Sequence, residues 1–416
     1  MSIDFTLTDA QAELKAAARR FARETLSQVR EAIHYLPTPE SRFLATRPFY
    51  EELVREGFLR RLIPQPFGGE GGGMVDMAIV AEEFYAEDAN VPLTAFANLL
   101  GLMPIFLAGT PEQQKAFVAP FLECRGAPLA ALASSEPGGS ANYHSDAVGG
   151  GVRTRARLDG QQWVIDGAKQ WISGASGWDG KGADLLCVVC RTDAGVAPQN
   201  GVSVLLVPGP AAGFRVNRYH ESPGHRGHLT SNFTLDQVRV PEGNIVGGVG
   251  QGLQVVDASF SATAALVGVM SLGVLRAAFD FTLHFARTQR RGGPVPVIEH
   301  QAVGYALADA KASIEAVRSL SYRACFALDQ QAPEALELAL HAKVFGSETA
   351  VRVITELMRV VGIDSYDHAT SPLASLLQDA LAFPLFDGGN MGVRRRQLHE
   401  LMKQDDYDSL STVFHL

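Results

Sequence analysis

The residue pattern changes twice along the chain, and the order of these patterns limits the possible folds more than any other feature. Up to about residue 127, apolar residues recur at three- and four-residue intervals, as in AQAELKAAARRFARETL, which is typical of amphipathic helices. Between about 128 and 245, short runs such as WVIDG and GVSVLLVPG alternate with glycine, proline, asparagine and aspartate, which indicates antiparallel strands and turns. Helical periodicity then returns.

This order predicts a mainly α-helical protein with a central β-domain. We expect an N-terminal helical domain over 1–127, a β-domain over 128–245 and a C-terminal helical bundle over 246–416. With 416 residues, of which 46% are hydrophobic, the chain can bury a large core. The segment 252–288 is rich in small residues, so its helix should pack closely against its neighbours.

The charge balance argues against polyanionic partners. The chain has 36 basic and 45 acidic side chains and a formal net charge of -9, so it has no general attraction for nucleic acid or an anionic membrane. No run approaches ~18 uninterrupted apolar residues, and we expect no membrane span. The first stretch, MSIDFTLTDAQAELKAAARRFARETL, carries acidic residues and no unbroken apolar core, so we do not expect a signal peptide.

The four cysteines suit a reduced, cytoplasmic protein better than a disulfide scaffold. Cys187 and Cys190 form a CxxC sequence inside ADLLCVVCR, an apolar run that predicts a buried strand. Residues three apart on a strand point to opposite faces, so we interpret both as structural rather than redox or metal-binding cysteines. Because no second CxxC or HxxxH accompanies them, we predict no metal site.

Two glycine runs, GGEGGG at 68–73 and GGVGQG at 247–252, invite comparison with nucleotide-binding loops. Neither forms GxGxxG after a strand, and the chain has no Walker A sequence. A Rossmann or P-loop site is therefore not expected, and any dinucleotide must be held in another way.

The sharpest local feature is the segment ALAFPLFDGGNMGVRRRQLHELM, where Asp387 follows mostly apolar residues. A carboxylate in apolar surroundings is costly unless it is paired or hydrogen-bonded, which indicates a functional group. The alternative is an ordinary turn residue before a helix. Arg394 and Arg395 both align with the apolar stripe of that helix, so either suits a counter-ion, whereas Arg396 points away. The alternative for the arginines is a solvated basic turn.

A second group of candidates lies around predicted strand ends. Ser134 and Ser135 belong to ALASSEPGGSANY, and Trp171 and Ser173 belong to DGAKQWISGASG. Such hydroxyl groups and an aromatic wall would suit the polar edge and the face of a flavin. Ordinary turn chemistry with a core tryptophan is the alternative.

A third group precedes a predicted helix. In RTQRRGGPVPVIEHQ, Arg290 and Arg291 come before a Gly-Gly-Pro loop, and Gln301 opens the helix. Guanidinium groups together with backbone amides at a helix start suit a pyrophosphate. The alternative is a hinge between two helices.

Taken together and in this order, several segments resemble the acyl-CoA dehydrogenase family over nearly the whole chain. They are LIPQPFGGEG, SSEPGGS, GAKQWIS, VIEHQAVGYALADAKASIEAVR and LFDGGNMGVRR. The resemblance implies a helical domain, a β-domain and a four-helix bundle. It also implies FAD, held between the β-domain and the bundles of two subunits, usually in a homotetramer.

The resemblance assigns roles to the flavin-side candidates. Trp171 would pack against the flavin, Ser173 would lie near its N5 atom, and Ser134 and Ser135 would line it. In the branch of the family that acts on nitro compounds, a histidine precedes Ser-Glu-Pro, and this chain has Ser134 at that position.

The same resemblance implies that the adenosine diphosphate part of FAD is contacted from a neighbouring subunit. Arg290 or Arg291 and Gln301 would make this contact, and Gly362 would let the cofactor approach. A glutamine expected just before this glycine is Met358 here.

Two departures bear on the substrate. Asp387 replaces the usual catalytic glutamate, and Ala264 replaces an arginine that contacts the CoA ester, which argues against an ordinary acyl-CoA substrate. The sequence is more similar to the branch of the family that acts on small nitro compounds, through SRFLATRPFY, SGWDGKGADLLCVVCR and PLFDGGNMGVRRRQ. That likeness selects Arg394 as the partner of Asp387 and places Thr263 where the branch has a serine between base and flavin.

The implied reaction is the oxidation of a neutral nitroalkane by O2. Asp387 would remove the α-proton, Arg394 would keep it ionised, and Thr263 would orient it. The carbanion would add to flavin N5, nitrite would leave, and an aldehyde or ketone and hydrogen peroxide would form. The alternatives are an acyl-CoA dehydrogenase with an aspartate base, a flavin monooxygenase on the same fold, and a binding scaffold without flavin.

Overall fold

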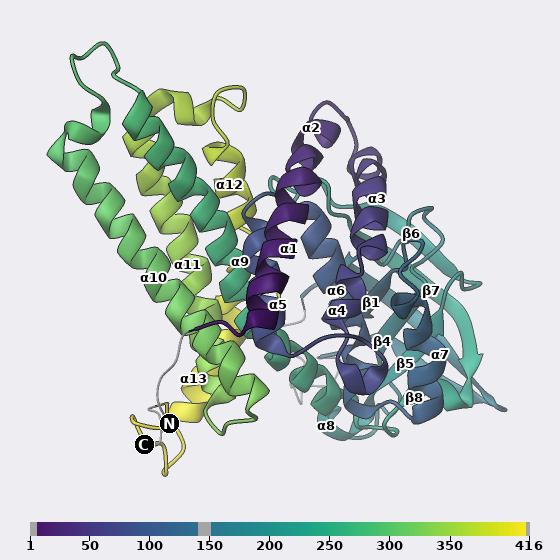
Figure 1. Ribbon diagram of the computed structural model, residues 1–416. Coiled ribbons are helices and arrows are strands. Elements are labelled where there is room, and N and C mark those ends of the chain that lie inside the picture. The colour runs from purple at the N-terminus through teal and green to yellow at the C-terminus, as the bar shows by residue number, and fades with distance from the viewer. Residues whose placement is uncertain (1–5, 140–150, 413–416) are drawn as a thin grey trace.

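The computed structural model describes residues 6–139 and 151–412, and its element order is the predicted one. Helices come first, a sheet follows, and helices return. In Figure 1 the bundle and the sheet lie on opposite sides of the first helices, so the three regions are side by side. The predicted mainly α-helical protein with a central β region is confirmed.

The first region is helical. Its α-helices are α1 (Asp9–Glu24), α2 (Val29–Ile33), α3 (Pro39–Arg55), α4 (Phe58–Leu62), α5 (Met74–Tyr85), α6 (Asn90–Ala108) and α7 (Pro111–Leu122). Three of them begin with a threonine whose hydroxyl accepts a hydrogen bond from the third helical residue in a capping box: Thr8, Thr38 and Thr110. Proline follows the cap of α3 and α7, where its missing N–H costs nothing.

The sheet has eight strands in the order β6-β7-β3-β2-β4-β5-β8, with β1 paired to β4. The strands are β1 (Ala130–Ala133), β2 (Arg155–Asp159), β3 (Gln162–Ser173), β4 (Leu185–Arg191), β5 (Val202–Pro208), β6 (Phe214–Tyr219), β7 (Thr230–Pro241) and β8 (Ile245–Val246), with the short helix α8 (Pro198–Gly201) before β5. Cys187 and Cys190 lie on β4 and are free and fully buried. Burial raises the pKa of both thiols, which agrees with a structural role.

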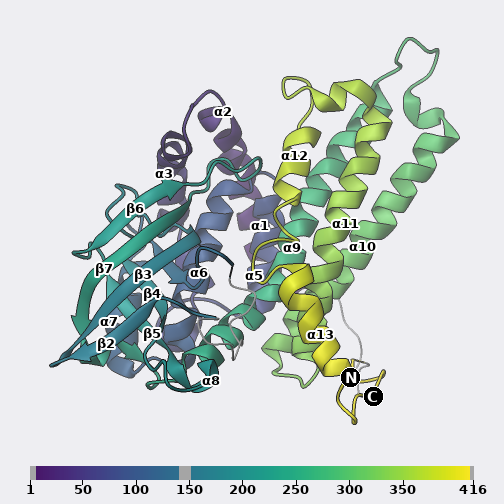
Figure 2. The ribbon, with the colours of Figure 1, turned by 180° about the vertical axis from the view of Figure 1, so that it is seen from behind.

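The last region is a bundle of long helices. Its α-helices are α9 (Gly252–Thr288), α10 (Gln301–Asp329), α11 (Ala335–Val361), α12 (Leu373–Ala380) and α13 (Arg395–Met402). Where α9 crosses α11, a Cβ added to Gly346 would lie 3.1 Å from the Cα of Gly268. The small residues therefore allow the close packing that the sequence predicted. Figure 2 shows the chain running from α12 down the side of the bundle to α13.

Charged side chains join the first helices to the bundle. Glu82 and Glu83 on α5 are almost fully buried and form ion pairs with Arg276 on α9 at 2.9 and 2.8 Å, while Arg19 and Arg318 complete the network. Burial by itself would raise the pKa of Glu83, but hydrogen bonds from two arginines outweigh it and hold that pKa at about 2. These carboxylates are thus ionised anchors between α5 and α9.

Two helices, α6 and α9, are long and apolar enough to cross a bilayer by length and composition. Most of the apolar stretch of each is buried inside the protein, 61% and 76% respectively, as expected of core helices.

Replacing Gly273 by alanine should destabilise the protein, whereas the same change at Gly304 should stabilise it. A Cβ at Gly273 would lie 2.6 Å from Tyr85 Cβ, so α5 and α9 would have to separate, at ~1–3 kcal/mol. At Gly304, inside α10, nothing lies within 4 Å, and alanine adds up to ~1 kcal/mol of helix propensity. Thermal unfolding followed by circular dichroism measures both; equal midpoints would contradict the tight α5–α9 contact.

Candidate active site

Asp387 lies in the turns between α12 and α13, in a backbone conformation that few aspartates adopt. Its φ is +51°, and Gly388 follows at +67°. Left-handed conformations of non-glycine residues persist where the surroundings hold them, and they cluster at functional sites. The sequence Asp-Gly-Gly is suited to such a turn because neither glycine carries a Cβ. Asp387 is therefore presented by a constrained turn.

The Asp387 carboxylate is fixed through both of its oxygens. Its side chain is 6% exposed, the Thr263 hydroxyl lies 3.0 Å from Oδ1, and Arg394 Nη2 lies 3.1 Å from Oδ2. Arg394 is fully buried, and it also donates to the Asp387 carbonyl at 3.0 Å and to the Phe260 carbonyl at 2.9 Å. The structure thus brings the three predicted catalytic residues together, and Arg394 is the counter-ion.

The other candidate counter-ion, Arg395, turns outward. Its guanidinium forms a bidentate pair with Glu348 at 2.7 and 2.8 Å, with both side chains about two-fifths exposed. The backbone before α13 is not the regular α-helix that the prediction assumed. The segment Asn390–Arg394 (η6) is a π-helix, and only then does α13 begin. This wider turn, a common feature of functional sites, sets Arg394 against Asp387.

Thr263 lies on α9, one helix away from the turn that carries Asp387. Its hydroxyl also lies 3.2 Å from the Phe260 carbonyl within the same helix. A hydroxyl has a single hydrogen to donate, and an ionised carboxylate is the stronger acceptor. Thr263 therefore orients Asp387 as a donor.

Trp171 is the predicted flavin wall, and the structure places it outside the core. The pairing of β3 with β7 shifts register between Lys169 and Ile172, and Trp171 takes a φ of +58° there. Such irregularities re-aim side chains. The indole is 53% exposed and stacks on His220 with 3.7 Å between ring centroids. The alternative of a core tryptophan is therefore wrong.

Ser173 ends the same strand, and a buried histidine holds it. The Ser173 hydroxyl lies 2.9 Å from His228 Nε2, and His228 Nδ1 lies 3.0 Å from the Thr94 hydroxyl. Burial lowers the pKa of His228 to about 3, so this ring is neutral near pH 7. The sequence reasoning missed His228 and His220, although the histidine-rich run HESPGHRGHL was a visible signal.

Ser134 and Ser135 follow β1 and lie beside the strand of Trp171. The Ser135 carbonyl accepts from the backbone N–H of Gln170 at 3.0 Å, and the Ser134 carbonyl accepts from buried Lys169 at 3.2 Å. The structure thus groups both serines with Trp171, as predicted. The last residue of the SSEPGGS motif, at position 140, lies outside the described residues.

The third predicted group gathers at another place. Arg291 donates to the Val361 carbonyl at 2.8 Å and pairs with Asp364 at 2.7 Å, which sets it beside Gly362. Arg290 lies next to it, and Gln301 begins α10. The α9–α10 and α11–α12 connections lie at the end of the bundle away from α13 (Figure 1). Within one chain, these residues are therefore separate from Asp387.

Sequence reasoning also missed a buried lysine beneath the catalytic turn. Lys343 on α11 is 0% exposed, and its Nζ donates to the Phe383 carbonyl at 2.9 Å and to Asn390 Oδ1 at 2.8 Å. The signal was present, because Lys343 shares a helix face with small and apolar residues, Ala339, Leu340, Gly346 and Ala350.

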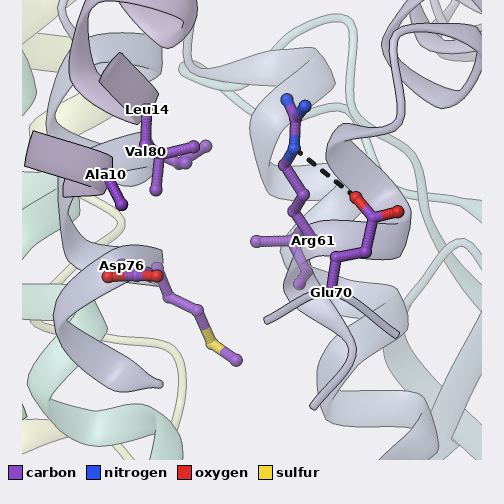
Figure 3. A pocket seen from close by; sticks show the side chains of 8 residues that line it. Ala10, Leu14, Arg61, Glu70, Asp76 and Val80 are labelled. Atoms are coloured by element: carbon purple, nitrogen blue, oxygen red, sulfur yellow. Dashed lines mark ion pairs between the residues drawn. The ribbon is translucent and has the colours of Figure 1, made fainter. Parts of the chain in front are cut away.

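Figure 3 shows a pocket elsewhere on the molecule, between α1, α5 and the chain that follows α4. Arg61 and Glu70 form an ion pair on one side of it, and Ala10, Asp76 and Val80 lie on the other side. None of the predicted site residues lines this pocket. It is therefore separate from the Asp387 site.

The arrangement around Asp387 suits proton removal from carbon. An arginine and a hydroxyl hold the carboxylate in place, as a general base requires. The residues also fit FAD: Trp171 offers a half-exposed ring face, and Ser173 offers a fixed hydroxyl. At Gly362, φ is +78° and an added Cβ would meet open space, so a ligand has room beside Arg291.

Changing Arg394 to methionine should lower the free energy of unfolding by ~3–5 kcal/mol, because Asp387 would stay buried without its counter-ion. Changing Asp387 to asparagine in the same chain removes the stranded charge and should recover part of that loss. Chemical denaturation of the wild type, both single variants and the double variant measures this. An Arg394→Met variant as stable as the wild type would mean that the ion pair does not stabilise the buried carboxylate.

Comparison with known proteins identifies the family of this chain. Models of the acyl-CoA dehydrogenase N-terminal, middle and C-terminal domains match residues 8–125, 131–238 and 250–402. A nitroalkane oxidase of Podospora anserina is 41% identical, covering 100% of this chain and 99% of its own. One from Fusarium oxysporum is 38% identical, with coverages of 99% and 98%.

A solved structure of a nitroalkane oxidase active-site mutant crystallised with 1-nitrooctane has the same fold. It superposes with a TM-score of 0.95 at 36% sequence identity, covering 99% of this chain and 100% of that one. The domain models match in the order that the structure shows, and the similar proteins align from end to end. The chain belongs to the acyl-CoA dehydrogenase family, and within it to the group of the nitroalkane oxidases.

Proposed function

We propose that this protein is an FAD-dependent oxidase of neutral nitroalkanes. The observation that carries the proposal is the buried Asp387 carboxylate, held at 3.0 Å from the Thr263 hydroxyl and 3.1 Å from Arg394. Overall, a nitroalkane, O2 and water would give an aldehyde or ketone, nitrite and hydrogen peroxide. The similarity to nitroalkane oxidases over the whole chain supports the same reaction.

Asp387 is the base in this proposal. A nitro group acidifies the carbon next to it, so a positioned carboxylate can take the α-proton without metal assistance. Arg394 holds Oδ2 and Thr263 holds Oδ1, so the remaining lone pairs of the carboxylate are left to accept the proton. General-base catalysis of this kind contributes ~10²–10⁴-fold.

Ala264 favours a small substrate over a CoA ester. Ordinary members of the family have an arginine at this position, which contacts the ester. Here Ala264 is fully buried in the bundle and offers neither charge nor hydrogen bond. A compact nitro compound needs no such anchor.

The cofactor completes the site. When bound, FAD supplies the acceptor for the electron pair of the substrate carbanion and returns the electrons to O2 as hydrogen peroxide. Ser134, Ser135, Trp171 and Ser173 would line the flavin, with the Thr94–His228 chain fixing the Ser173 hydroxyl.

Arg290 or Arg291, with Gln301 and Gly362, would hold the adenosine diphosphate part. Because these residues lie at the far end of the bundle, they would serve the FAD of a neighbouring subunit (Figure 1). We therefore propose a homotetramer with FAD at subunit interfaces, in the cytoplasm.

The substrate class can be tested without oxygen. The purified yellow protein is mixed anaerobically with nitroethane and, separately, with a medium-chain acyl-CoA. Nitroethane should bleach the flavin, with nitrite released and peroxide formed when air is admitted. Bleaching by the acyl-CoA alone would instead mean a dehydrogenase with an aspartate base, and a colourless protein that binds no FAD would mean a scaffold.

The role of Thr263 is tested by a matched pair of variants. Thr263→Val keeps the shape but removes the hydroxyl, and should slow flavin reduction by nitroethane at least ~10-fold, because hydrogen bonds to charged groups contribute ~1.5–3 kcal/mol. Thr263→Ser keeps the hydroxyl and should stay within a few-fold of the wild type. Stopped-flow absorbance measures both rates of flavin reduction. Equal rates for the two variants would mean that the Thr263 hydroxyl does not orient Asp387.

A further inference from the structure

Lys343 carries a buried amino group that the proposed reaction does not use. It lies in the middle of α11 on the face turned to the interior, where Gly346 contacts α9. Burying an ammonium group is costly, and well-packed apolar residues often stabilise a core equally well. A lysine at this position therefore needs an explanation beyond packing.

The contacts of Lys343 explain why a lysine is found there. Nζ of Lys343 donates to the carbonyl of Phe383 at 2.9 Å and to Oδ1 of Asn390 at 2.8 Å. These two residues stand at either end of the turn that carries Asp387. Lys343 thus ties both ends of this turn to α11.

Asn390 is held from its other side by the same helix. Its Nδ2 donates to the Ser347 hydroxyl at 3.0 Å and to Glu348 Oε1 at 3.1 Å. Lys343, Ser347 and Glu348 of α11 therefore all bind Asn390, which leaves little freedom at the start of the π-helix that carries Arg394.

Three charged groups act on Lys343, and two of them are the catalytic pair. Burial lowers the pKa of Lys343 to about 7, the Asp387 carboxylate raises it, Arg394 lowers it, and Glu348 raises it. Lys343 is thus electrostatically coupled to the base as well as bonded to the turn that presents it.

We propose that Lys343 is a positioning residue for Asp387. By binding Phe383 and Asn390 it fixes the turn between them, and so keeps the carboxylate against Thr263 and Arg394 despite the left-handed backbone at Asp387. The inference rests on the proposed function, because it requires that Asp387 removes a proton.

The test compares two substrates of one variant. Lys343→Met removes the ammonium and both hydrogen bonds at similar length. Neutral nitroethane needs the base, whereas ethyl nitronate, formed beforehand in alkali, has already lost the proton. Flavin reduction by nitroethane should slow by roughly 10–100-fold, the scale of a misplaced catalytic group, while reduction by the nitronate stays within about twofold.

Ile354→Ala is the matched control. Ile354 is fully buried on the same helix, several turns from Lys343, so its loss lowers stability without touching the turn of Asp387. It should leave both rates near the wild type. If Lys343→Met does not fold, Asn390→Ala removes the contact between Lys343 and Asn390 together with the bonds of Asn390 to Ser347 and Glu348, and should slow reduction by nitroethane selectively, in the same direction.

The outcomes separate the two proposals. Selective loss of the nitroethane rate in Lys343→Met supports positioning. Equal loss with both substrates, or no loss with either, overturns it. A wild type that is reduced by neither nitroethane nor ethyl nitronate overturns the proposed function itself, whatever the variant does.

Discussion

A charged pair taken out of water underlies this site: the carboxylate of Asp387 and the guanidinium of Arg394, 3.1 Å apart and almost wholly buried. Each charge would be prohibitively costly there alone, so the chain must bring both to one place and satisfy their remaining hydrogen-bonding groups. Arg394 meets this demand through two backbone carbonyls as well as the carboxylate. The left-handed turn and the π-helix are the local distortions that make the pair possible.

The rest of the bundle supports this pair. Glycines let α9 and α11 cross closely, so the groups on both helices, Thr263 on one and Lys343 on the other, reach the same turn. Buried ion pairs of Glu82 and Glu83 fix α9 to α5 and hence to the region that packs on the sheet. The sheet in turn presents Trp171 and Ser173. The position of the Asp387 carboxylate thus depends on the contacts of α9 with α11 and with α5, which lie far from it in the sequence.

Periodicity and turn residues predicted the succession of helices, strands and helices, because these patterns reflect which faces are buried. The same reasoning found Asp387 but left Arg394 and Arg395 equivalent, since helical spacing assumes a regular α-helix and a π-helix has no comparable sequence pattern. It offered a core Trp171 as one alternative because the irregular pairing of β3 is a tertiary feature. It missed His228 because its partner Ser173 is distant in sequence, a contact that only folding creates.

One measurement tests whether Asp387 takes the proton from carbon. Flavin reduction is followed anaerobically in the Asp387→Asn variant with neutral nitroethane and with pre-formed ethyl nitronate. We predict that the reaction with nitroethane falls by ~10²–10⁴-fold, the usual contribution of a general base, while the nitronate still reduces the flavin at close to the wild-type rate. Reduction by neutral nitroethane at the wild-type rate would contradict the assignment of Asp387 as the base.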